Sequence, residues 1–282
     1  MSVTWAVHAY AWTSHWTDDD LPIIDRARAL GLDAVEIPLM DLDDVHPAAI
    51  RARAEAEGMR LVTSTVCGAA TDPCSPDPAV RAAARDYLAA CVDVTAELGA
   101  PVMGGVLYAH HGGRIDGRPE RVLLDRSAEV LADVARHAAR RGVTLGLEPC
   151  NRYETYLVNT ADQALELADL IGEPNVGVHL DSYHMNIEED EFAAPIRRVG
   201  DRLVHFHLSE SHRGIPGQGT VAWGEVMGAL DAIGYGGFVG LESFEEIAPS
   251  MRAATCVWRD MAPSSDALVA GGLAHLKGLV AA

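Results

Sequence analysis

Short, nearly continuous apolar runs alternate with longer amphipathic stretches along the whole chain. Runs of this kind are typical of parallel strands that are buried on both faces. Eight are found, at 4–8, 33–37, 60–66, 101–106, 143–148, 175–181, 202–208 and 237–242. Between them apolar residues recur at helical spacing, most clearly over 79–99 and 121–142. Gly58, Gly99 and Gly142 each separate a predicted helix from the next strand. The pattern therefore indicates a repeated strand–helix unit.

Eight such units in 282 residues give about 35 residues per unit, which accommodates a strand, a helix and both loops. We therefore predict the α/β class and a (β/α)8 barrel, or TIM barrel, that forms a single domain over residues 1–282. A final helix is expected near 264–280. An open, doubly wound sheet is the alternative, and it is less favoured because no GxGxxG motif follows the first strand.

Acidic residues outnumber basic residues by 41 to 22, which gives a net charge of −19 with histidine neutral. Such a charge repels nucleic acid and anionic membranes, so neither is expected as a partner. No apolar run approaches the ~20 residues of a membrane span and no signal peptide is recognisable, which predicts a cytoplasmic protein. Lys277 is the single lysine, so enzymes that form a Schiff base through a lysine are nearly excluded.

Residues with metal-binding side chains end the last four predicted strands, and they are Glu148, Asp181, His207 and Glu242. Their separations of 33, 26 and 35 residues are each close to one unit, so a barrel would place them at similar heights around one rim. Three carboxylates and one imidazole suit Mn²⁺, Mg²⁺ or Co²⁺ better than a thiolate-loving metal. The alternative is that these residues only mark where strands reach solvent, but burying four such groups without a metal is costly.

Further polar residues in the loops after these strands are candidates to bind the oxygens of a polyol. They are Asn151, Arg152, Glu154, His184, Glu210, His212 and Arg213. The glycine-rich segment 214–219 (GIPGQG) follows the seventh strand, where barrels often bind phosphate. It lacks the lysine and the Ser/Thr of a phosphate-binding loop, so a mobile lid or a plain turn is favoured over phosphate binding.

Four other histidines lie near the predicted strand ends. His205 precedes His207 by two residues and is therefore on the same strand face but one layer deeper, which favours a supporting or packing role. His8 ends the first strand and either lines the site or is a satisfied core residue. The roles of His110 and His111, in the predicted loop after the fourth strand, stay open.

Four ordered motifs resemble those of the xylose-isomerase-like barrel superfamily of sugar isomerases and epimerases. They are LGLEPCNRYET from 145, DSYHMNIEE from 181, HFHLSESHRGIPGQGTV from 205 and GLESF from 240. Within that superfamily the chain looks most like the ketose 3-epimerases, the D-tagatose and D-allulose (psicose) 3-epimerase group. The resemblance is strongest over 145–244. It is weaker in the N-terminal half, above all at 110–120, so the substrate is less well indicated than the reaction.

The resemblance implies a metal-dependent epimerase that inverts C3 of a free ketose through an enediolate. The implied metal ligands are Glu148, Asp181, His207 and Glu242. Glu148 and Glu242 are also implied as the acid/base pair, one on each face of the sugar. Mn²⁺ is the expected ion, ahead of Co²⁺ and Mg²⁺.

The resemblance also implies how a small-molecule sugar is held. Glu154, His184 and Arg213 would bind O1 to O3 of the ketose, and Phe244 would form the apolar wall near the far carbons. A homodimer or homotetramer is the expected assembly.

Other functions on the same scaffold stay open. An aldose–ketose isomerase would use the same metal but move a hydrogen between C1 and C2. A dehydratase of the inositol-pathway type and a lyase of the C-glycoside type are further possibilities. Of the more distant classes, a non-catalytic sugar-binding subunit is disfavoured by the intact set of four ligands. An endonuclease-IV-like DNA-repair barrel is disfavoured by the charge of −19.

Overall fold

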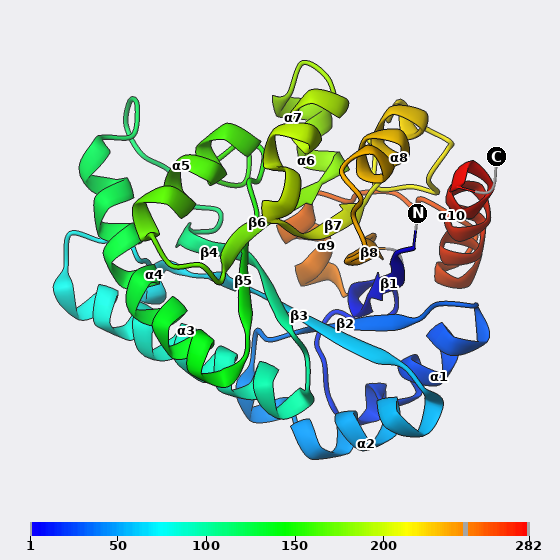
Figure 1. Ribbon diagram of the computed structural model, residues 1–282. Coiled ribbons are helices and arrows are strands. Elements are labelled where there is room, and N and C mark those ends of the chain that lie inside the picture. The colour runs from blue at the N-terminus through cyan, green and yellow to red at the C-terminus, as the bar shows by residue number, and fades with distance from the viewer. Residues whose placement is uncertain (1, 245–247, 281–282) are drawn as a thin grey trace.

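Eight parallel strands pair in chain order and close into a barrel in the computed structural model, which describes residues 2–244 and 248–280 (Figure 1). The strands are β1 (Thr4–His8), β2 (Ala34–Pro38), β3 (Arg60–Cys67), β4 (Val102–His110), β5 (Thr144–Leu147), β6 (Val176–Asp181), β7 (Leu203–Leu208) and β8 (Phe238–Leu241). β1 pairs with β8 over four residues, and this pairing closes the ring. The predicted (β/α)8 barrel is confirmed, and each predicted strand is found within a few residues of its expected bounds.

Helices follow the strands and surround the barrel (Figure 1). They are α1 (Pro22–Ala29), α2 (Pro47–Glu57), α3 (Pro78–Leu98), α4 (Arg121–Arg141), α5 (Ala161–Ile171), α6 (Ser182–Glu188), α7 (Ala193–Val199), α8 (Trp223–Ala232), α9 (Pro249–Thr255) and α10 (Ser265–Val280). Gly58, Gly99 and Gly142 cap α2, α3 and α4 in the left-handed conformation, which glycine adopts without steric cost. The predicted helix boundaries at these glycines are therefore confirmed.

The interior of the barrel has an apolar end and a polar end. A small buried cluster formed by strand residues, including Ala34 and Phe238, fills the amino-terminal end of the barrel. Residues two apart on a strand share a face, so Glu36 lies inside the barrel above Ala34, and His207 lies above His205. The polar residues of the interior therefore point toward the carboxyl ends of the strands, where barrels of this kind carry their chemistry.

Glycines in the strands make room for the imidazoles inside the barrel. A Cβ on Gly104 would lie 2.7 Å from Nδ1 of His179, and one on Gly146 would lie 3.2 Å from the Cβ of the same histidine. A Cβ on Gly240 would come within 3.4 Å of the His205 ring. These close approaches explain why strands that otherwise favour branched residues contain glycine at these positions.

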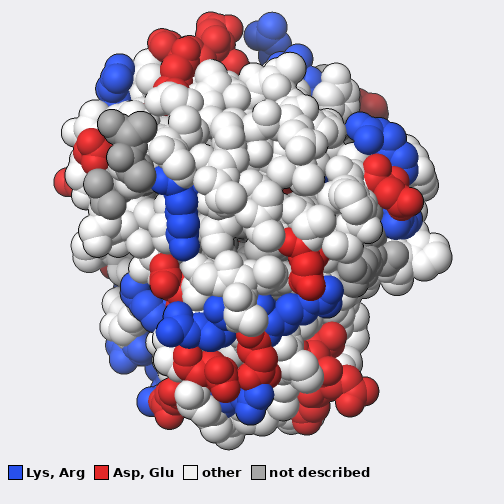
Figure 2. All heavy atoms as spheres, turned by 90° about the vertical axis from the view of Figure 1, so that its right-hand side faces the viewer, with Lys and Arg blue, Asp and Glu red and all other residues white. Residues whose placement is uncertain are grey.

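The helices at the right of Figure 1, α1 and α10 among them, carry ion pairs on their outer sides. Arg26 pairs with Asp266 at 2.6 Å, and Arg53 on α2 pairs with Asp25. Figure 2 shows this side, where a row of basic side chains runs beside acidic ones and the surface above is largely uncharged. Among the helices of residues 2–244 and 248–280, none combines the length and apolar character that crossing a membrane requires.

Candidate active site

The four residues predicted as metal ligands lie together at the carboxyl ends of β5 to β8. Asp181 is the last residue of β6 and His207 lies within β7, whereas Glu148 and Glu242 each follow the last residue of their strand. Asp181 and His207 are paired across the sheet, which places them at one height. All four side chains are at least 89% shielded from solvent. The structure therefore brings the predicted set to one rim, and their role as metal ligands stays a prediction.

Three of the four converge on a common point. One ligand atom each from Glu148, Asp181 and His207 lie within 4.8 Å of one another. Nδ1 of His207 is 3.8 Å from Oε1 of Glu148 and 3.7 Å from Oε2 of Glu242. This combination of carboxylate oxygens and one imidazole nitrogen is a donor set that a divalent cation accepts.

The His207 ring offers a further sign that a cation fits here. Within the described part of the chain, its buried Nδ1 has no hydrogen-bond partner. Burial lowers the pKa of His207, but Glu36 and Glu242 outweigh this and raise it to about 10. The same negative surroundings that attract a proton to Nδ1 would attract a metal ion to it. The residues therefore fit a divalent metal.

Glu242 is engaged by Arg213. Nη1 of Arg213 forms an ion pair with Oε2 of Glu242 and another, at 3.0 Å, with Oδ2 of Asp181. The same atom donates to Oγ of Ser209 at 2.9 Å. Burial raises the pKa of Glu242, but Arg213 and His207 more than offset this and lower it to about 2. The guanidinium thus compensates the buried negative charge of Glu242 and Asp181.

The carboxyl of Glu148 is in the opposite situation. Burial raises its pKa well above the ordinary value, and the neighbouring carboxylates of Glu242 and Asp181 raise it further, while His207 lowers it. Two buried carboxyls in one site, one with a raised and one with a lowered pKa, form the kind of pair that enzymes use for acid and base chemistry.

Glu154 and His184, two predicted sugar-binding residues, are connected through Asn151. The backbone N–H of Asn151 donates to Nδ1 of His184 at 3.2 Å, so the proton of the neutral ring is on Nε2. That Nε2 lies 3.8 Å from both Glu148 and Asp181 and therefore faces the carboxylates of the rim. Nδ2 of Asn151 donates to Oε1 of Glu154 at 2.9 Å.

A cavity of about 310 Å³ opens above these groups. Its walls include Phe244, Tyr10 and Met251, which pack together, and the guanidinium of Arg213 lies 5.2 Å from the Phe244 ring centre. The predicted apolar wall at Phe244 therefore lines the same cavity as the polar residues. Such a cavity, apolar on one side with convergent polar groups on the other, suits a small polar ligand.

Two of the histidines whose roles the sequence did not define, His8 and His111, also border the cavity. His8 is buried, its Nδ1 accepts from the backbone N–H of Tyr10 at 3.1 Å, and its Nε2 bonds Oγ of Ser64 at 3.0 Å. His8 is therefore both a satisfied core residue and part of the cavity wall. His111 lies 3.3 Å from Oε2 of Glu154. His110 belongs to β4, whereas the sequence predicted a loop there.

Beneath the rim lies a buried polar layer that includes Glu36 and His205. Glu36, fully buried on β2, accepts from Nε2 of His205 at 2.7 Å and from Nε2 of His207 at 2.8 Å. The predicted supporting position of His205 is confirmed. A charged residue among the apolar residues 34–37 was the available signal for Glu36, but nothing in the sequence indicated its partners.

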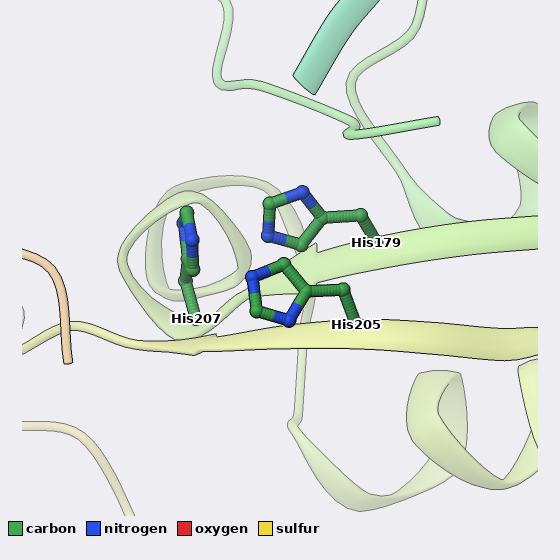
Figure 3. Close-up of side chains that lie close together, drawn as sticks. All are labelled: His179, His205 and His207. Carbon is green, nitrogen blue, oxygen red and sulfur yellow. The ribbon is translucent and has the colours of Figure 1, made fainter. Parts of the chain in front are cut away.

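Three neighbouring histidines of this layer, His179, His205 and His207, each have a ring nitrogen within 4.8 Å of the others (Figure 3). The rings of His179 and His205 are tilted by 35° with centres 4.3 Å apart, and the His207 ring stands nearly perpendicular to that of His179. Burial lowers the pKa of His179 well below its usual value, so this ring packs in the neutral form.

Arg152 and Glu210, two candidates for polyol binding, form their hydrogen bonds with protein groups. Arg152 forms a bidentate pair with Glu188 at 2.9 Å and lies largely in solvent. The Glu210 carboxylate accepts from the backbone N–H groups of Ser211, Gly217 and Val221 and from Nε1 of Trp223. These expectations were wrong because both side chains pair with protein groups outside the cavity.

The contacts of Glu210 also explain the segment 214–219. Burial raises the pKa of Glu210, but its four N–H donors outweigh this and lower it, so the group remains a carboxylate. A negative charge at the centre of the loop uses the backbone N–H groups that a phosphate would otherwise bind. The loop is a turn organised around Glu210, which corresponds to the plain turn, one of the two alternatives predicted beside a mobile lid.

Fold and site together define a (β/α)8 barrel enzyme whose cavity is formed by carboxylates, histidines and one arginine at the carboxyl ends of the strands. The chain belongs to the xylose isomerase-like TIM barrel family, whose model matches residues 24–265.

Characterised relatives and solved structures agree with this membership. The chain is 36% identical over 273 residues to a ketose 3-epimerase of Arthrobacter globiformis, covering 96% of this chain and 94% of the relative. It is 34% identical to a D-psicose 3-epimerase of Ruminiclostridium cellulolyticum, covering 92% and 89%. A crystal structure of D-allulose 3-epimerase from Methylomonas sp. in complex with D-allulose superposes with a TM-score of 0.93 at 34% identity, covering 98% and 97%. These relatives are epimerases, a subclass of isomerases.

Proposed function

We propose that this protein is a ketose 3-epimerase that inverts C3 of a free ketose by removing and returning a proton. The observation that carries the proposal is the placement of Glu148 and Glu242. Their carboxylates lie 3.8 and 3.7 Å from the same His207 nitrogen, yet they follow β5 and β8, which are separated by two strands. A sugar above His207 would therefore have one carboxylate on each side of C3.

Inversion at C3 requires a base on one face and an acid on the other. One carboxylate takes the C3 proton, the resulting enediolate is planar at C3, and the opposite carboxyl returns a proton to the other face. Arg213 and the Nε2–H of His184 supply donors next to the developing negative oxygens. Glu154, held by Asn151, is placed to accept from a sugar hydroxyl.

Glu148, Asp181, His207 and Glu242 are proposed to hold a divalent metal. When bound, such an ion acts as a Lewis acid that makes the proton next to the ketone more acidic. Mn²⁺ is the proposed ion, ahead of Co²⁺ and Mg²⁺, because the donor set is hard to borderline. A cytoplasmic location and a homodimeric or homotetrameric assembly complete the proposal.

Solvent deuterium tests the reaction directly. In deuterated water, the epimerised ketose is expected to contain deuterium at C3, because the proton passes through carboxyl groups that exchange with solvent. The measurement is proton and carbon NMR of the product formed from D-allulose or D-fructose with Mn²⁺ present. An aldose product without deuterium at C3 would instead identify a 1,2-isomerase that moves hydride directly.

Free ketoses are expected to be better substrates than ketose phosphates. The charged groups around the cavity include Glu148, Glu154 and Glu242, and the cation beside them, Arg213, is already paired with Asp181 and Glu242. A phosphate dianion would therefore meet net negative charge. We expect kcat/KM to be at least about tenfold higher for the free sugar, the effect of ~1.4 kcal/mol of repulsion. Equal or higher kcat/KM for the phosphate, measured under the same conditions, would contradict this expectation.

A further inference from the structure

Glu36 is a fully buried carboxylate. It takes no part in the proton transfers of the proposed reaction. It lies on β2, and its two closest partners lie on β7, from which β8 and β1 separate it around the closed barrel. Its Oε2 is 2.8 Å from Nε2 of His207 and 2.7 Å from Nε2 of His205. A charge is held in the interior of a protein only when its partners and geometry compensate the loss of hydration. Its placement beside a candidate metal ligand therefore calls for a functional reason.

The contact with Glu36 determines which nitrogen of His207 is available. A carboxylate only accepts hydrogen bonds, so the proton in the 2.8 Å contact belongs to Nε2 of His207. Nδ1 is on the opposite side of the ring and faces Glu148 and Glu242 at 3.8 and 3.7 Å. The ring is thus held with one nitrogen directed to the polar layer and the other to the rim.

We propose that Glu36 is the positioning residue of the candidate metal site. It holds the His207 ring and its Nε2 proton so that the Nδ1 lone pair is directed at a divalent cation. This inference rests on one part of the proposed function, the binding of a divalent cation at the rim, and does not depend on epimerisation. Hydrogen bonds of this kind to metal-binding imidazoles typically change metal affinity by ~10–100-fold.

The His205 ring that binds Glu36 is itself anchored. Nδ1 of His205 lies 3.2 Å from the carbonyl oxygen of Phe238, so this ring spans from β8 to Glu36. Oε1 of Glu36 lies 3.6 Å from Nε2 of His8 and has no hydrogen-bond partner within the described part of the chain. The hydrogen bonds of Glu36 are therefore concentrated on Oε2, the atom that His207 and His205 share.

Three substitutions of Glu36 test separately whether the position of its acceptor oxygen or its negative charge matters. Glu36→Gln removes the charge but keeps an acceptor oxygen at the same distance from the backbone. Glu36→Asp keeps the charge but withdraws it by one methylene group, and Glu36→Leu removes both. The probe is Mn²⁺ alone, titrated by calorimetry into protein freed of metal. We expect Glu36→Leu and Glu36→Asp each to weaken Mn²⁺ binding by ~10–100-fold, and Glu36→Gln to weaken it by less than about tenfold.

The absorption spectrum of bound Co²⁺ gives a second readout, because its visible bands depend on the ligand geometry. We expect altered bands in Glu36→Asp and near wild-type bands in Glu36→Gln. Asp93→Asn is the matched control, since Asp93 forms a 2.9 Å bond with Nε2 of His137 on the outside of the barrel. It should leave Mn²⁺ affinity unchanged, and melting curves without metal should show that each variant is folded.

Two results would overturn the inference. Mn²⁺ affinity in folded Glu36→Asp equal to that of the wild type would mean that charge alone matters, and unchanged affinity in Glu36→Leu would mean that Glu36 has no part in metal binding. Both differ from failure of the proposed function, in which the wild-type protein itself would bind no divalent metal or would epimerise no ketose. Wild-type binding without epimerisation, combined with the expected order of the variants, would support the inference and reject the proposed reaction.

Discussion

Replacing Glu148 or Glu242 by glutamine is expected to lower kcat for epimerisation by at least ~10²–10⁴-fold, the usual contribution of a general acid or base. Each change removes the group that gives or takes a proton on one face of C3. Because the two carboxylates follow β5 and β8, neither is placed to act on the other's face. The loss should therefore be large in either variant. The measurement is kcat for a ketose and its C3 epimer in both directions, with Mn²⁺ saturating.

A matched control for these variants is Glu173→Gln. Glu173 pairs with Arg136 at 3.0 Å on the outside of the barrel, so the same chemical change there should leave kcat unaltered. Metal content measured on each variant separates the two expected roles of the carboxylates. Turnover at the wild-type rate in Glu148→Gln with metal bound would remove that residue from the acid/base pair.

Removal of the divalent metal is expected to abolish turnover and to lower the melting temperature. A ligand present at 100 times its Kd stabilises the folded state by ~2.7 kcal/mol, and each kcal/mol corresponds to roughly 2–4 °C in a chain of this size. We therefore expect a shift of roughly 5–10 °C on prolonged chelation. Without the ion, the buried carboxylates of Glu148 and Asp181 lose a positive partner. Addition of Mn²⁺ should restore both activity and melting temperature.

The variant Asp181→Asn provides the control for this experiment. Since Asp181 is one of the three residues whose ligand atoms converge, chelation should change the melting temperature of this variant much less than that of the wild type. A protein sample shown by elemental analysis to lack metal, yet active at the full rate, would exclude the proposed metal dependence.

Much of the fold and rim could be predicted because the relevant information is local. Each apolar run encodes a strand that is covered on both faces, and the near-constant spacing between runs encodes the repeated unit. A polar residue at the end of such a run lies at the rim of any barrel. Asp181 and His207 could thus be assigned to one height before their pairing across β6 and β7 was known.

The partners of the buried charges could not be predicted in this way. Glu36 is separated from His205 and His207 by 169 and 171 residues, and only closure of the barrel brings β2 within hydrogen-bond reach of β7. The partners of Glu210 could not be predicted either, although they are close to it in the sequence. Its sequence position suggests a sugar-binding residue, whereas the path of the loop through Gly217 turns backbone N–H groups onto it.

The barrel, the rim and the types of side chain at each strand end thus follow from the sequence, because strand periodicity and unit length depend on neighbouring residues. The nitrogen of His207 that faces the rim and the cation that compensates Glu242 become known only from the folded chain. The physical reason is that hydrogen bonds and ion pairs act over a few ångströms in space between residues far apart in the chain. Their geometry exists only once the strands have closed into the barrel.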